Sequence, residues 1–134
     1  MQVALPPPPW VRAACLLAFA AFLVQLFVLD EPLLVERLVN LTWDKFMHAL
    51  AFGGVAALLW TGLGCDAPYV TWILVALTGA ADELHQVFVP GRHADVLDVL
   101  ADTLGAGIAV YALHRLAIRR RPCAESWARS RAAT

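Results

Sequence analysis

The stretch from Asp82 to Gly107, DELHQVFVPGRHADVLDVLADTLGAG, places many polar side chains between and inside segments that are apolar enough for a membrane. It contains five carboxylates, two histidines, a glutamine and an arginine. An ionisable side chain inside a bilayer costs on the order of 3 to 10 kcal/mol, so it faces a protein interior or a wet cavity and marks a working site. The rest of the chain is organised around this stretch.

The composition is that of a small integral membrane protein with one domain. The chain has 134 residues, of which 60% are hydrophobic, whereas soluble domains are about half apolar. The net charge is only −1, but six of the ten lysines and arginines lie from Arg115 to the end. We therefore expect the lipid bilayer, and no nucleic acid, as the main partner.

Four apolar segments predict an all-α membrane bundle of four transmembrane helices. A proline-rich stretch, residues 1–12, comes before them and a basic tail, residues 117–134, comes after them. Residues 30–42 have the spacing of a short interfacial helix but also fit a plain connecting loop. The four helices are expected at about residues 13–29, 46–63, 69–89 and 94–116, so the membrane domain covers residues 13–116.

The distribution of positive charge predicts the orientation. Short loops rich in lysine and arginine stay in the cytoplasm, and the tail is the most basic part of the chain. Both termini are therefore expected in the cytoplasm of a bacterium, and the protein is expected to be multi-pass in the inner membrane. The start of the second segment, the end of the third and the start of the fourth then share the outer leaflet.

Helical spacing places the polar residues of these three segments on inward faces. Asp82, Glu83 and Gln86 share one face of the third segment, and Asp98 and Asp102 are four residues apart on the fourth. Residues from different parts of the chain thus converge on one pocket. The candidate pocket residues are Lys45, His48, Asp82, Glu83, Gln86, Arg92, Asp98 and Asp102.

The charge balance of this pocket restricts what it holds. Six acids, including Asp44 and Asp95, face two fixed cations, Lys45 and Arg92, which leaves four negative charges in excess if all ionise. Such a site needs protons on its carboxylates, protonated histidines, a divalent metal ion or a cationic ligand. The candidate metal ligands are His48, Glu83, His85, Asp98 and Asp102.

Structural roles are the alternative explanation for several of these residues. Lys45 is then an interfacial anchor, Arg92 locks the turn after Pro90, and the acids of the fourth segment form salt bridges that fix helix order. Gly105 and Gly107 are expected to permit close helix packing. The tryptophans are expected to be interface anchors.

The ordered motifs resemble those of the VanZ-like family of small bacterial membrane proteins. They are Asp44-Lys45-x-x-His48, then Asp82-Glu83-x-His85-Gln86 with Pro90-Gly91-Arg92, then Asp98-x-x-x-Asp102-x-x-Gly105, and they cover residues 43–107. The resemblance implies a multi-helix membrane protein. The family is named for a member associated with resistance to teicoplanin, and the resemblance implies no known reaction.

Three classes of function follow from these observations. The first is a pocket facing the outer leaflet that acts in cell-envelope physiology or glycopeptide susceptibility, by binding or modifying an envelope lipid or a glycopeptide-type ligand. The second is a metal-dependent hydrolase or transferase that acts on a lipid-linked intermediate. The third is a proton or ion relay. The sequence leaves open whether the protein is an enzyme, and it does not define the oligomeric state.

Overall fold

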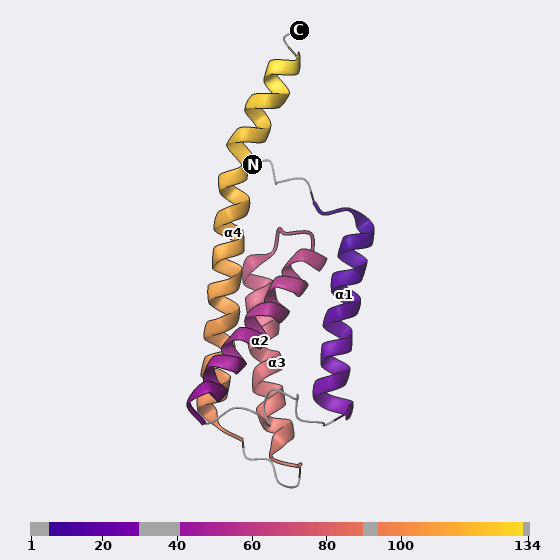
Figure 1. Cartoon of the computed structure of the whole chain (residues 1–134). Helices are drawn as coiled ribbons and strands as arrows, with labels where there is room; N and C mark the ends of the chain where they lie inside the picture. The colour runs from indigo at the N-terminus through magenta and orange to yellow at the C-terminus, as the bar shows by residue number, and fades with distance from the viewer. Residues whose placement is uncertain (1–5, 30–40, 90–93, 133–134) are drawn as a thin grey trace.

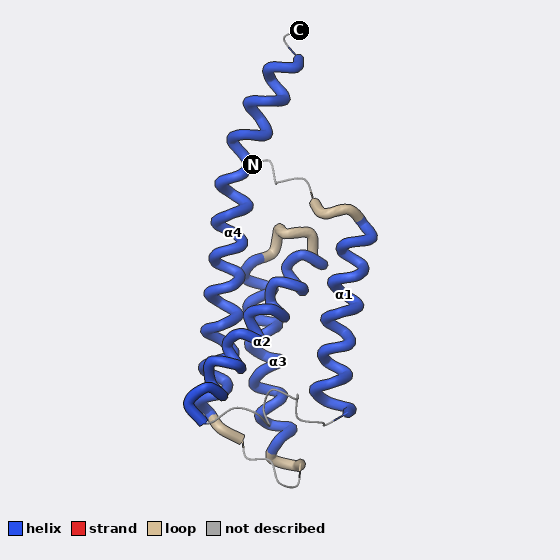
Figure 2. The backbone as a smooth tube through the Cα atoms, viewed as in Figure 1, coloured by secondary structure: helices blue, strands red, loops and turns tan. Residues whose placement is uncertain are grey.

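A computed structural model describes residues 6–29, 41–89 and 94–132 of the chain, and within them it contains four α-helices and no strand (Figure 1, Figure 2). The all-α prediction is therefore confirmed. Most of the predicted interfacial segment, residues 30–42, lies outside the described residues, and so does Arg92. The helices are α1 (Pro9–Val24), which a π-helical turn (Gln25–Leu29) extends, α2 (Leu41–Gly62), α3 (Pro68–Gln86) and α4 (Val96–Ala132).

Two of the helices begin at a proline. Pro9 opens α1 and Pro68 opens α3. Proline suits the first helical turn, because its fixed φ is already helical and its missing N–H has no partner there. For this reason α1 begins earlier than the apolar run from Ala13 indicates, inside the proline-rich stretch.

The bounds of the last two helices also differ from those expected. Helix α3 ends at Gln86. After it, the N–H groups of Phe88 and Val89 donate to the carbonyls of His85 and Gln86, three residues back, instead of four as in an α-helix. Helix α4 begins at Val96, with the Asp95 carboxylate accepting the Leu97 N–H at 2.9 Å as an N-cap. It continues to Ala132, past residue 116, through a stretch rich in alanine and arginine, which are strong helix formers.

The helices form a bundle in which α2 and α4 run in the same direction, opposite to α1 and α3 (Figure 1). Helix α2 packs most extensively against α4, and α1 packs mainly on α2. The start of α2, the end of α3 and the start of α4 therefore meet at one end of the bundle. The turn between α2 and α3 lies at the other end.

Glycine brings the backbones of α2 and α4 into direct contact. A Cβ atom at Gly105 would collide with the backbone carbonyl of Ala49. A Cβ atom at Gly53 would lie 3.2 Å from the Gly105 carbonyl oxygen. The expectation that Gly105 permits close packing is confirmed, since small residues let membrane helices approach in this way.

Polarity in the bundle is inverted relative to a soluble protein. Large apolar side chains point outward, with Leu77, Leu104 and Ile108 each more than 60% exposed. A small apolar core lies between the helices and consists of Phe52, Val55, Ala56, Leu59, Val75, Ala106 and Val110. The buried polar side chains are Thr71, Asp82, Glu83, Gln86, Asp98 and Asp102. An apolar exterior around buried carboxylates is the pattern expected in a lipid solvent.

Two stretches within the described residues are long and apolar enough to cross a membrane. They are Pro9–Val28 and Val96–Ile118. Helices α2 and α3 are not among them, and each carries charged residues at the polar end of the bundle, such as Lys45 and Glu83. Length and composition alone thus support two of the four predicted spans.

We predict that Gly105→Ala destabilises the protein much more than Gly54→Ala does. At Gly105 the added methyl group must separate α2 from α4, and overpacking of this kind costs about 1 to 3 kcal/mol. Nothing lies within 4 Å of a Cβ atom at Gly54, and alanine favours a helix over glycine by roughly 0.5 to 1 kcal/mol. Unfolding of both variants in the same detergent measures the difference. Equal stability would show that α2 and α4 do not touch at Gly105.

Candidate functional site

Polar side chains from three helices meet at one end of the bundle, and we call this group the acidic end. The structure brings together all the predicted pocket residues that it describes, and Arg92 is the one that lies outside the described residues. The acidic end consists of Asp44, Lys45 and His48 on α2, Asp82, Glu83 and Gln86 on α3, and Asp95, Asp98 and Asp102 at the start of α4.

Lys45 links α2 to the beginning of α4. Its ammonium group lies 2.5 Å from a carboxylate oxygen of Asp95 and 2.5 Å from one of Asp98, and it is 4.0 Å from Asp44. The Asp98 side chain is only 9% exposed, whereas that of Asp95 is 43% exposed. The contact with Asp98 is therefore the better shielded from solvent.

His48 and Asp102 form a second link between the same helices, one turn deeper. His48 Nδ1 lies 3.1 Å from Asp102 Oδ1, and the imidazole ring stacks on Phe52. Asp102 is fully buried. Its second oxygen, Oδ2, has no hydrogen-bond partner and lies 2.8 Å from where a Cβ atom of Gly79 would be. Glycine on α3 thus makes room for the carboxylate.

Helix α3 supplies a hydrogen-bonded group of its own. The Gln86 amide donates to Asp82 at 3.0 Å and to Glu83 at 3.2 Å. The other oxygen of Glu83 accepts the backbone N–H of Asp95 at 2.6 Å. Glu83 therefore holds the residue at which α4 is capped, and α3 positions the acids of α4.

Contacts within the acidic end shift the pKa values of Lys45 and Asp95, which lie outside the two stretches of membrane-spanning length. Burial lowers the pKa of Lys45, but hydrogen bonds to Asp95 and Asp98 outweigh this effect and raise it above its ordinary value. The hydrogen bond from Lys45 lowers the pKa of Asp95 below its ordinary range. Both groups are charged at neutral pH. Within the described part of the acidic end, six carboxylates face one fixed cation, Lys45.

Three side chains of the acidic end have the spacing of metal ligands. One atom each from Asp44, His48 and Asp98 lies within 4.8 Å of the other two. His48 and Asp98 were predicted as ligands, whereas Asp44 was counted only among the acids of the pocket. Its position four residues before His48, on the same helix face, was the available signal.

Of the other predicted ligands, Glu83 and Asp102 lie elsewhere in the acidic end, whereas His85 is not part of it. Glu83 faces the cap of α4, and Asp102 orients His48. The ring of His85 packs against Phe27 in the π-helical turn, with 5.7 Å between ring centroids.

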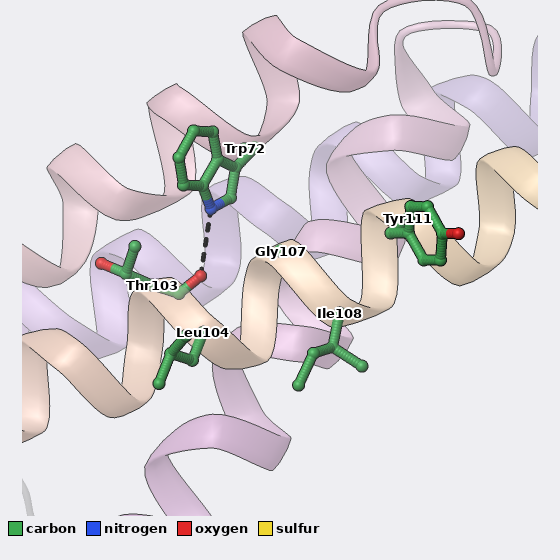
Figure 3. A pocket seen from close by; sticks show the side chains of 6 residues that line it. All are labelled: Trp72, Thr103, Leu104, Gly107, Ile108 and Tyr111. Atoms are coloured by element: carbon green, nitrogen blue, oxygen red, sulfur yellow. Dashed lines mark hydrogen bonds between the residues drawn. The ribbon is translucent and has the colours of Figure 1, made fainter.

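Trp60 is not the interface anchor that the sequence suggested. Trp60 is buried, with 4% exposure, at the edge of the apolar core. The indole N–H of Trp72 donates to the Thr103 carbonyl at 3.0 Å, and the ring lies over Gly107 (Figure 3). Gly107 has no side chain to obstruct it, so the indole packs on the α4 backbone.

A shallow apolar groove of about 270 Å³ lies beside this contact, between α3 and α4. Sequence reasoning missed it, because it arises from the packing of two helices and not from a motif. The groove is separate from the acidic end. It is lined by Trp72, Thr103, Leu104, Gly107, Ile108 and Tyr111 (Figure 3).

The apolar exterior, the two spanning-length stretches and the buried carboxylates are typical of a small helical membrane protein, with polar residues gathered at one end. The model of the family described as VanZ/LLP1 matches residues 10–118, which is most of the chain. The chain therefore belongs to the VanZ-like family, as its motifs indicated. No curated protein and no solved structure gives a match.

We predict that Asp98→Asn destabilises the protein more than Asp95→Asn does. Both changes remove a charge that Lys45 contacts, but the pair with Asp98 is the more buried, and exposed pairs contribute little. Asparagine is also a good N-cap, so the cap of α4 survives at position 95. Thermal unfolding in detergent with a chelator tests the order. The reverse order would mean that Lys45 is held mainly by Asp95.

Proposed function

We propose that this VanZ-like protein spans the bacterial inner membrane four times with both termini in the cytoplasm, and that its acidic end binds or modifies an envelope lipid or ligand. The acidic end then lies in the outer leaflet. The function is in cell-envelope physiology, and the ligand class includes glycopeptides such as teicoplanin. Membership of the VanZ-like family supports this proposal.

One observation carries the proposal: the buried acidic residues gather at a single end of the bundle, although two helices, α3 and α4, supply them, and α2 adds the half-buried Lys45 and His48. Asp82, Glu83, Asp98 and Asp102 are each less than 9% exposed. Each one is hydrogen-bonded to a neighbour, either in the same helix or in another part of the bundle. Carboxylates that only anchored a helix at the interface would stay in water. Buried acids at one depth fit a site for a polar headgroup.

The direction of the helices supports the orientation. The extended, arginine-rich end of α4 lies at the opposite end of the bundle from the acidic residues (Figure 1). Positive charge next to a span favours the cytoplasmic side. The acidic end then faces outward, where envelope precursors and glycopeptides are encountered.

We predict opposite accessibility for cysteines placed at the two ends. In a background in which Cys15, Cys65 and Cys123 are serine, a membrane-impermeant maleimide should label Ala94→Cys in intact cells. It should label Asp66→Cys, in the turn between α2 and α3, only after permeabilisation, because that turn is expected in the cytoplasm. Both positions are exposed, so access and not burial decides the result. If only Asp66→Cys were labelled in intact cells, the protein would have the opposite orientation to the one proposed.

We also predict that production of the protein changes the teicoplanin susceptibility of a sensitive bacterial host, and that Asp98→Asn abolishes the change. Asp98 is buried within the acidic end, so the loss of its charge alters the site. Asp66→Asn is the matched control, since it makes the same chemical change at the opposite end. The measurement is the minimum inhibitory concentration at equal membrane levels of each variant. An unchanged value for the wild-type protein would contradict a role in glycopeptide susceptibility.

A further inference from the structure

We propose that the acidic end binds a divalent metal ion through Asp44, His48 and Asp98, with Asp102 orienting His48 as a ligand. This inference rests on the proposed function, because the ion would be the group that holds a polar envelope ligand. The three ligand atoms come from α2 and α4, the two helices whose backbones are in contact. The backbone contact therefore fixes their separation.

The His48–Asp102 pair has the arrangement that prepares a histidine for a metal. Asp102 contacts Nδ1 of the ring, which leaves Nε2 as the nitrogen for coordination. Metal-binding histidines generally use their second nitrogen in this way, with a carboxylate or carbonyl that fixes the tautomer and the ring orientation. The stack of the ring on Phe52 restricts it further.

The burial of Asp102 independently points to a cation. This carboxylate is completely buried, and its Oδ2 atom has no hydrogen-bond partner. A buried carboxylate with one hydrogen bond and a second oxygen without a partner is poorly compensated. A cation on Nε2 would strengthen the positive charge at Nδ1–H and so offset the charge of Asp102.

The donor set indicates which ions fit. One imidazole and two carboxylates combine the ligand preferred by first-row transition metals with those preferred by harder ions. Mn²⁺ and Zn²⁺ accept such a mixture, whereas Ca²⁺ takes oxygen ligands alone. Three protein ligands also leave coordination positions open, which a phosphate or carboxylate oxygen of an envelope ligand would fill.

Lys45 competes with the ion for this site. Its ammonium group contacts Asp98 and lies 4.0 Å from Asp44, so it neutralises two of the three proposed ligands. Two cations on one carboxylate repel each other. The ammonium must therefore leave Asp98 when the ion binds, and Asp95, its other partner, is in place to retain it.

The test is a titration of untagged protein in detergent with Mn²⁺, followed by electron paramagnetic resonance, with Zn²⁺ as the competitor. We expect one Mn²⁺ per chain in the wild-type protein, tighter binding in Lys45→Met, and loss of the site in His48→Gln. Asp102→Asn should weaken binding by about 10- to 100-fold, as other changes to the residues that orient metal ligands do. His114→Gln is the matched control and should bind like the wild type, because this residue lies about 24 Å along α4 from Asp98.

Two results would overturn the proposal. One is the absence of stoichiometric Mn²⁺ or Zn²⁺ binding in both the wild-type protein and Lys45→Met, each with native helical content. The other is binding that His48→Gln leaves unchanged, or that His114→Gln reduces equally. If the titration fails while Asp98→Asn still changes teicoplanin susceptibility, the metal site is wrong and the envelope function stands. If the metal binds and susceptibility never changes, the envelope function is wrong.

Discussion

The close parallel contact between α2 and α4 sets the geometry of the whole bundle. Gly105 lies against the backbone of Ala49, and this contact sets how far α4 is shifted along α2. The same register places Lys45 beside Asp98 and His48 beside Asp102. A slip of one helical turn, about 5.4 Å, would break both pairs. A contact in the apolar part of the bundle therefore determines the chemistry of its polar end.

The acidic end shows how a small membrane bundle tolerates several carboxylates. Asp98 is compensated by Lys45, and Glu83 accepts a backbone N–H group and the amide of Gln86. Asp102 is the exception, since it receives one contact from His48 although it is fully buried. A buried oxygen without a hydrogen-bond partner, Asp102 Oδ2, thus belongs to the residue that also orients the histidine. That is why Asp102 points to a bound cation more clearly than the total charge does.

The sequence predicted the helices and the convergence of the site, but not the finer geometry. Spacing on single helices placed Asp82, Glu83 and Gln86 on one face, and the alternating direction of the helices brought that face to Lys45 and Asp98. Periodicity says nothing of which side chain meets which on another helix. The proximity of Asp44 to His48 and Asp98, and the groove beside Trp72, therefore required the structure. The end of α4 was missed because a basic composition suggests a tail, whereas alanine and arginine favour a helix.

A purely structural explanation of the acidic end accounts for only part of it. The pair between Lys45 and Asp98 would suffice to fix the order of α2 and α4. Buried ionic groups beyond such a lock are commonly no more stable than apolar residues of the same size. Asp82, Glu83 and Asp102 are nevertheless buried beside that pair. Gly79, which lacks a Cβ atom, leaves the space that the Asp102 carboxylate occupies. Residues that oppose stability and are accommodated so closely are expected where a protein binds a ligand. The cluster is thus better explained by a function than by packing.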